Sequence, residues 1–170
     1  MAFALPHDVE DAIERAPRWP PRILQSLART VRVSTAFSVG CSSMTLLQVD
    51  VRERALLNKL EHASIPHRAV TLDLGDVLCL PFWIVERKTN QDFAESLRSG
   101  RWHEQQHRLL TSGLRAVYII EGDHRRTSMP YPSLLGACVN AELRALNVFR
   151  ACDIDETVHI IVHLYHKCRD

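Results

Sequence analysis

Short apolar runs alternate with amphipathic segments from residue 45 to residue 168, and this alternation constrains the fold more than any other feature. Runs typical of buried strands lie at TLLQVDV (45–51), HRAVTLDL (67–74), AVYIIEG (116–122) and LNVFRAC (146–152). DVLC (76–79) and FWIVERK (82–88) flank Leu80-Pro81 and predict a β-hairpin. Helical patterns lie at residues 52–63, 91–99, 101–112, 132–144 and 153–168. Strands that alternate with helices predict an α/β fold in which helices cover a sheet.

Residues 1–44 differ from the rest, and we expect them to form an N-terminal extension whose function is open. A short helix is predicted at 7–16, and PRWPP ends it. The extension is basic from residue 15 and has no acidic residue after that point. A solvated face with a loop is the simplest interpretation, and a nucleic-acid-contacting arm or part of a targeting sequence are the alternatives. Four acidic residues among 8–14 argue against a simple transit peptide.

The composition indicates a globular protein but does not identify what it binds. The 170 residues, 46% hydrophobic and 24% charged, suit one globular domain. A formal net charge of +1 means that a nucleic-acid binder would have to gather its basic residues locally. No apolar run approaches the roughly 18 residues of a membrane span, and no secretory signal is present, so no membrane partner is expected. An odd number of cysteines without a C-x-x-C pair predicts reduced intracellular thiols and no zinc site: Cys41, Cys79, Cys138, Cys152 and Cys168.

The predicted hairpin gathers charged side chains on one face of the sheet. If its turn centres on Pro81, Asp76 lies opposite Glu86, and directly opposed residues have Cβ atoms about 5 Å apart. Lys88 shares the face of Glu86, whereas Arg87 points to the other face. Two adjacent carboxylates need a compensating charge, and a hard divalent cation is the natural one. The alternative is that Asp76 is a turn residue and that Glu86 and Lys88 lie on an exposed strand edge.

Two more acidic residues follow the first predicted strand. Asp50 and Glu53 could add carboxylates to the same site from a neighbouring strand. Carboxylates and a lysine around a metal ion are suited to phosphodiester hydrolysis, because the metal activates a water and stabilises the departing oxyanion.

Four strings then occur in a characteristic order with short gaps: VDVRE (49–53), LGDVLCLPFWIVERKTNQDF (74–93), SLRSGRWHEQQHRL (96–109) and VYIIEG (117–122). Together they resemble the nuclease domain of the XPF family of structure-specific endonucleases, which includes the MUS relatives. That family carries V-D-x-R-E, then G-D, then V-E-R-K-x-x-x-D, then S-I-x-D-G-R-x-x-E-Q. The resemblance is good over about residues 45–123 and continues more weakly to residue 170.

The resemblance implies a restriction-endonuclease-like core over residues 45–170, with a central mixed β-sheet flanked by helices. It implies an endodeoxyribonuclease that uses Mg²⁺ or Mn²⁺ to cut one strand near branch points (flaps, forks or junctions) in DNA repair or recombination. Whether RNA is also cut stays open. A nuclear location is implied by the family alone, with an organellar or viral origin as open alternatives.

The resemblance also implies roles for individual residues, according to their positions in the family motifs. Asp76 and Glu86 correspond to the main metal ligands, Asp50 and Glu53 to supporting ones, and Lys88 to the residue that positions the water. Arg87 and Asp92 are further charged members of the catalytic motif, and Glu53 is also counted as catalytic. Arg52, Lys88 and Arg101 are the candidates for contact with DNA.

The sequence departs from the family pattern at Ser99, where the family has an acid, and at Gln106, where it usually has a lysine. No helix-hairpin-helix DNA-binding module is present, which predicts either a fragment or a stand-alone nuclease that obtains DNA binding elsewhere. The family implies a homodimer or a heterodimer with a related non-catalytic subunit. The broad apolar face of the helix at 153–168 is accounted for equally by core packing and by a subunit interface.

Two alternatives to an active nuclease remain. The first is a catalytically silent nucleic-acid-binding or scaffold subunit that keeps the fold, although an intact set of motif residues argues against it. The second is zinc hydrolysis, since HEQQH (103–107) matches H-E-x-x-H, but no third ligand completes that set.

Overall fold

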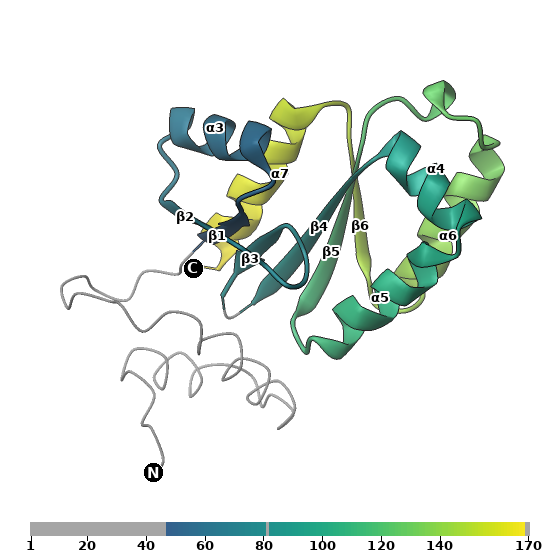
Figure 1. Cartoon of the computed structure of the whole chain (residues 1–170), viewed down its shortest axis with the longest axis horizontal. Coiled ribbons are helices and arrows are strands. Elements are labelled where there is room, and N and C mark those ends of the chain that lie inside the picture. Colours follow the sequence, from purple (N-terminus) through teal and green to yellow (C-terminus); the bar gives the residue numbers. More distant parts are fainter. Residues whose placement is uncertain (1–46, 81, 169–170) are drawn as a thin grey trace, which may run out of the picture. The chain divides into compact units, whose positions relative to one another are not determined.

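The computed structural model describes residues 47–80 and 82–168, which lie within the compact unit Thr45–Asp170. One mixed sheet of six strands has the order β2-β1-β3-β4-β5-β6 (Figure 1). Its strands are β1 (Leu47–Asp50), β2 (His67–Val70), β3 (Val77–Cys79), β4 (Trp83–Thr89), β5 (Arg115–Glu121) and β6 (Asn147–Ala151). The helices of the described residues are α3 (Arg54–His62), α4 (Asn90–Arg98), α5 (Arg101–Thr111), the short 3₁₀ helix η1 (His124–Arg126), α6 (Tyr131–Glu142) and α7 (Ile154–Lys167). The α/β prediction is confirmed, and the predictions made for residues 1–44 lie outside the described residues.

Helices cover both faces of the sheet, as Figure 1 shows: α3 and α7 lie on one side and α4, α5 and α6 on the other. Each side has its own apolar core. Because side chains alternate along a strand, Val85 of β4 enters the core under α3 and α7, while Ile84 enters the core under α4–α6. The same alternation decides on which side each charged residue of β4 emerges.

The predicted hairpin is confirmed, with β3 antiparallel to β4 and Val77 opposite Val85. β3 is also antiparallel to β1, whereas β4 and β5 are parallel neighbours. The carboxyl end of β4 therefore lies beside that of β5, and the amino end of β3 meets both β1 and β4.

One predicted strand is shorter than expected. The run at 67–74 leaves the sheet after Val70, because the Leu72 amide donates to the Asp50 carboxylate instead of to a neighbouring strand. The chain then turns at Gly75, whose φ of 73° favours glycine. A Cβ at Gly75 would lie 2.7 Å from Cγ1 of Ile84, so this turn is pressed directly against β4.

The final helix is accounted for by core packing. Val158, Ile161 and Tyr165 of α7 are buried, and Ile160 and Leu164 are partly buried against the same core. The described residues therefore give no support to a subunit interface on this helix. None of the helices among them is long and apolar enough to cross a membrane.

Candidate active site

Asp76, Glu86 and Lys88 come together on the sheet face that carries α4 and α5. Extending the β3–β4 register by one residue sets Asp76 opposite Glu86, as the hairpin predicted. The backbone N–H of Arg87 donates to Oδ2 of Asp76 at 2.7 Å, which fixes this carboxylate beside β4. Nζ of Lys88 donates to Oε1 of Glu86 at 3.2 Å, and the Lys88 side chain is only 9% exposed.

The charge of this cluster is not fully compensated. Burial is the largest influence and the negative charge of Glu86 the second, and they raise the pKa of Asp76 to about 7. The N–H of Arg87 and the charge of Lys88 lower the same pKa, while Glu53 raises it further. Such a carboxyl group gains its charge easily only when a cation comes near.

An open cavity of about 330 Å³ gives access to the cluster. Asp76, Glu86 and Glu53 line one part of it. Arg52 and Arg108 line another part, and Nη2 of Arg108 donates to the carbonyl oxygen of Asp73 at 2.9 Å. Carboxylates beside arginines form a pocket that can accept a cation and a phosphate side by side.

Arg87 emerges on the opposite sheet face, as the strand alternation predicted, and there it links two acids. Its Nε and Nη2 donate to both carboxylate oxygens of Glu121 at 2.8 and 2.7 Å, and its Nη1 donates to Glu53 at 3.1 Å. Arg87 does not line the cavity, and its predicted catalytic role stays a prediction.

Asp50 is held by hydrogen bonds and does not line the cavity, and its role as a supporting metal ligand stays a prediction. Its carboxylate is fully buried and accepts hydrogen bonds from the side chain and backbone of Arg52 and from the Leu72 amide, at 2.6–2.9 Å. The hydrogen bond from the Arg52 side chain is the main reason why the pKa of Asp50 falls to about 2. Asp50 ties the start of the 71–76 turn to β1.

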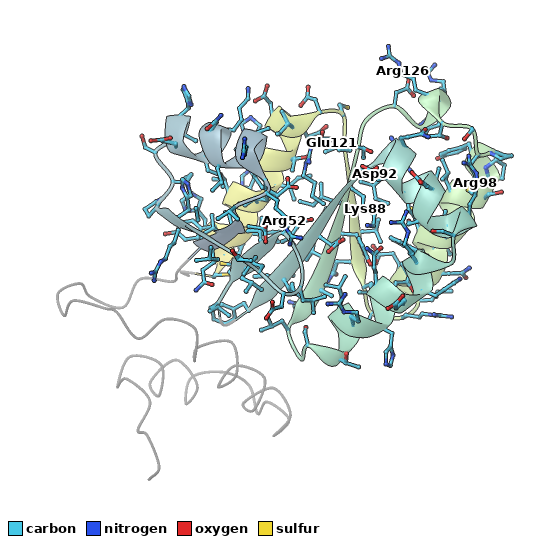
Figure 2. The ribbon with its side chains drawn as sticks, in the orientation of Figure 1. Arg52, Lys88, Asp92, Arg98, Glu121 and Arg126 are labelled. Atoms are coloured by element: carbon cyan, nitrogen blue, oxygen red, sulfur yellow. The ribbon has the colours of Figure 1, made fainter. Side chains whose placement is uncertain are left out.

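Asp92 belongs to the start of α4. Its Oδ2 accepts from the Thr89 hydroxyl at 2.6 Å, and its backbone N–H donates to that hydroxyl at 3.1 Å, so the two residues cap the helix reciprocally. Figure 2 shows Asp92 at this helix and Lys88 over the sheet. Asp92 is exposed and takes part in capping this helix, and its predicted catalytic role stays a prediction.

Arg101 begins α5, is exposed, and donates from Nε to the Ser99 hydroxyl at 3.0 Å. It does not line the cavity, so contact with DNA would take place outside it. Arg52 does line the cavity, with a side chain that is 71% exposed.

The zinc alternative finds no support at the described positions. His103, Glu104 and His107 of HEQQH are all exposed, and so are His159, His163 and His166 of α7. Across 47–80 and 82–168, no three His, Cys, Asp or Glu side chains already converge on a metal position.

Sequence reasoning missed four residues around the cluster. Glu121 and Arg108 were not recognised because their partners are 34 and 35 residues away. Tyr118 pairs with Glu86 in the parallel register, and its buried hydroxyl and the Oε1 atom of Gln105 have no hydrogen-bond partner among the described atoms. Burial first, and then the charges of Glu86 and Asp76, raise the pKa of Tyr118. The alternation of side chains along the predicted strand VYIIEG was the one sequence signal that could have pointed to Tyr118.

A mixed sheet with an acidic pair and a lysine beside a tight turn defines the restriction-endonuclease-like class of nuclease fold. Comparison with known proteins supports this class. XPF from Aeropyrum pernix, solved in complex with DNA, superposes with a TM-score of 0.66 and 32% identity, covering 72% of this chain and 64% of that one.

The chain belongs to the ERCC4 domain family, whose model matches residues 49–164. The structure-specific endonuclease subunit MUS81 of Homo sapiens is 31% identical over 139 residues, which is 66% of this chain and 25% of that protein. Crossover junction endonuclease mus81 of Emericella nidulans is 30% identical over 107 residues, which is 56% of this chain and 16% of that protein. The chain thus spans a quarter or less of these curated relatives.

Proposed function

We propose that this chain is a metal-dependent, structure-specific DNA endonuclease that cuts one strand near branch points during repair or recombination. The observation that carries the proposal is the meeting of Asp76, Glu86 and Lys88 beside an open cavity. The relatives are named structure-specific or crossover junction endonucleases, and the solved neighbour was in complex with DNA. If the chain acts in DNA repair, we expect it in the nucleus.

The donor set fits a hard divalent cation, with Mg²⁺ or Mn²⁺ as the candidates. Asp76 and Glu86 would hold it and Glu53 would support them, since all three line the cavity and the raised pKa of Asp76 reflects uncompensated negative charge. The bound ion would supply Lewis acidity and lower the pKa of a water.

The chain's own groups would orient the reacting atoms. Lys88, held by Glu86, would direct a water toward the phosphorus atom. The water oxygen would form a bond to phosphorus and lose a proton to solvent, while the bond from phosphorus to the sugar oxygen would break and that oxygen would gain a proton from solvent. Arg52 and Arg108 would bind the phosphate from their positions at the cavity, and Arg101 would contact the DNA backbone farther out.

Cleavage of branched DNA tests this function directly. The purified chain is incubated with end-labelled flap, fork, junction and duplex DNA in Mg²⁺, in Mn²⁺ or in EDTA. We expect strand incision near the branch point with either ion and none in EDTA. Asp76→Asn and Glu86→Gln should each lower the rate at least about 100-fold. Asp155→Asn, which breaks only the exposed Lys59–Asp155 ion pair, should stay within about threefold. A folded, DNA-binding chain that cuts nothing would instead favour the silent-subunit alternative.

We also propose that the chain pairs with a second copy of itself through α6. Four of the seven exposed large hydrophobic side chains among the described residues form a row at intervals of four along this helix and its C-cap: Tyr131, Leu135, Val139 and Leu143. Rows of this spacing on two helices interlock when the helices pack together. Exposed apolar rows of this kind mark interaction surfaces.

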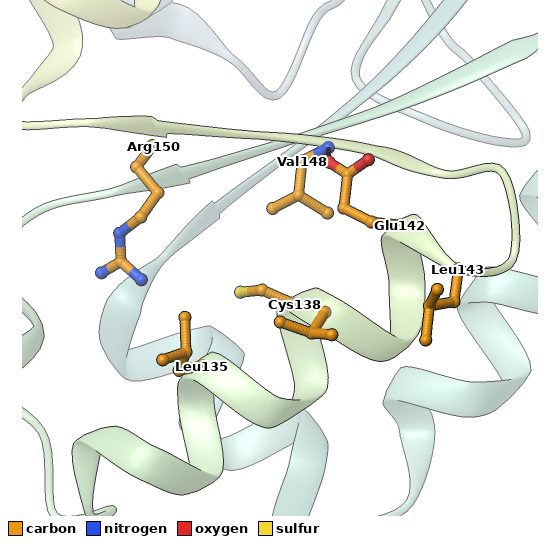
Figure 3. Close-up of a pocket in the computed structure, with 7 residues that line it drawn as sticks. Leu135, Cys138, Glu142, Leu143, Val148 and Arg150 are labelled. Carbon is orange, nitrogen blue, oxygen red and sulfur yellow. Dashed lines mark hydrogen bonds between the residues drawn. The ribbon is translucent and has the colours of Figure 1, made fainter.

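The groove beside this row extends the surface. It has a volume of about 320 Å³ between α6 and β6, and Figure 3 shows Leu135, Cys138 and Val148 around it with Arg150 and Glu142 at its margins. β6 ends the sheet, so one of its edges is unpaired within the described residues. An apolar centre with charged margins is the usual arrangement of a protein–protein interface.

A further inference from the structure

Glu121 ends β5 at the carboxyl edge of the sheet and holds the Arg87 guanidinium with two hydrogen bonds. The same guanidinium makes one longer hydrogen bond, at 3.1 Å, to Glu53. The side chains of Arg87, Glu121 and Glu53 are 17%, 13% and 21% exposed, so solvent screens these charges only weakly. One cation is thus shared unequally between two carboxylates.

Because Arg87 is shared unequally, it compensates the negative charge of Glu53 only in part. A guanidinium that binds a carboxylate through two N–H groups is engaged more strongly than through one. Without the negative charge of Glu121, Arg87 would bind Glu53 through two N–H groups and compensate its charge more completely. Glu53 lines the cavity with Asp76 and Glu86, so its charge contributes to what the cavity can bind.

Glu121 is itself held from a second direction. Oε2 of Glu121, which accepts from Nε of Arg87, also lies 2.9 Å from the hydroxyl of Thr157. Thr157 is fully buried in the first turn of α7. The carboxylate therefore cannot swing away from Arg87 without losing this bond.

The side chain of Glu53 does not cap the helix that begins after it. It is the N-cap residue of α3, yet its side chain makes no capping hydrogen bond. Its carboxylate reaches across to Arg87 instead. This leaves the second oxygen of Glu53 open to a ligand in the cavity.

We propose that Glu121 is a positioning residue, which by engaging Arg87 leaves the negative charge of Glu53 only partly compensated and directed to the metal site, and that Thr157 secures Glu121 in this role. The inference rests on the proposed function, since it assigns the metal to the cavity. It adds to the site a residue on the opposite face of the sheet that touches neither metal nor DNA.

The test measures Mn²⁺ affinity by calorimetry and the Mn²⁺ dependence of cleavage in the same proteins. Glu121→Gln keeps the shape and one acceptor oxygen, and should weaken Mn²⁺ binding about 10-fold or more. The half-saturating Mn²⁺ concentration for cleavage should rise in parallel, with the rate largely restored at saturating Mn²⁺. Thr157→Val, which removes only the hydroxyl, should have a smaller effect in the same direction.

Two comparisons separate positioning from mere stability. Asp155→Asn breaks the exposed Lys59–Asp155 ion pair, at 2.6 Å, which also joins α3 to α7, and should leave Mn²⁺ affinity unchanged. In a Glu53→Gln background, adding Glu121→Gln should weaken Mn²⁺ binding no further, because Glu121 acts through Glu53.

The outcomes divide cleanly. If the parent chain neither binds Mn²⁺ nor cuts DNA, the proposed function itself fails. If the parent does both but Glu121→Gln binds Mn²⁺ as tightly as the parent, only this inference is overturned. A loss that persists undiminished in the Glu53→Gln background would also overturn it. Should Glu121→Gln fail to fold, Thr157→Val decides by the same criteria, with thermal unfolding as the control for folding.

Discussion

At the scale of single residues, Asp76 combines an unfavourable electrostatic environment with its proposed role as a metal ligand. Burial and the nearby Glu86 and Glu53 oppose its charge, and Lys88 and the N–H of Arg87 compensate only in part. A group that destabilises the free protein while preparing it for a ligand is a recurring feature of functional sites.

This predicts an unusual pH dependence of stability in EDTA. The pKa of Asp76 is raised from 3.8 to about 7, so the folded state binds a proton more tightly than the unfolded state. Its contribution to stability is therefore full below about pH 4 and is lost as pH rises through about 7. Urea unfolding across this range should show the decline, and Asp76→Asn should flatten it. Cleavage should rise over the same range, and an Asp76→Asn protein with the parent's pH profile of stability would contradict the assignment.

At the scale of elements, the turn at 71–76 sets the position of the site. Asp50 and Arg52 hold its beginning, and Gly75 presses its end against Ile84 just before Asp76. The position of the proposed metal site therefore depends on this turn.

Gly75→Ala should disturb the site through the backbone. A Cβ would lie 2.7 Å from Ile84 at a φ of 73°, so both strain and displacement follow. We expect a loss of roughly 1–3 kcal/mol in urea unfolding together with much slower cleavage. Gly100→Ala is the matched control, because Gly100 has a φ of 75° but open space around the added Cβ. It should lose stability from strain alone and retain cleavage, and equal losses of cleavage in both variants would refute this role of the turn.

The elements themselves were largely predictable, and the reasons are local. Period-two and helical patterns gave nearly all of them, and the position of Pro81 gave the register that sets Asp76 opposite Glu86. The hydrogen-bond partners of Asp50 and Arg87 were not predictable, because Leu72 and Glu121 are brought near only by the folded sheet. The sequence of a strand shows which side chains share one of its faces, but not which residues far away in the sequence form hydrogen bonds with them.

At the scale of the whole molecule, the site cavity and the exposed apolar row lie at different places, both on the side of the sheet that carries α4, α5 and α6. The edge near α5 carries the cavity with the acidic cluster, while α6 and β6 carry the exposed apolar row and its groove. A second copy on α6 would therefore leave the site cavity open to DNA.

The dimer proposal gives a measurable mass. Light scattering should show a dimer for the parent chain and a monomer for Leu135→Glu combined with Val139→Glu, because buried charges oppose association. Leu110→Glu is the control, since Leu110 is also an exposed apolar residue, 39% accessible, but belongs to α5. A monomeric parent chain, or a dimer that survives the double substitution, would rule out this surface for self-association.

The claim on which the account depends is that Asp76 and Glu86 together hold a divalent cation. Anomalous diffraction at the manganese edge, from crystals of the chain soaked in Mn²⁺, tests it most directly. We predict one strong peak about 2.2 Å from a carboxylate oxygen of each residue, and none in crystals of Asp76→Asn. A peak held by other side chains, or no peak in the parent crystals, would contradict the account.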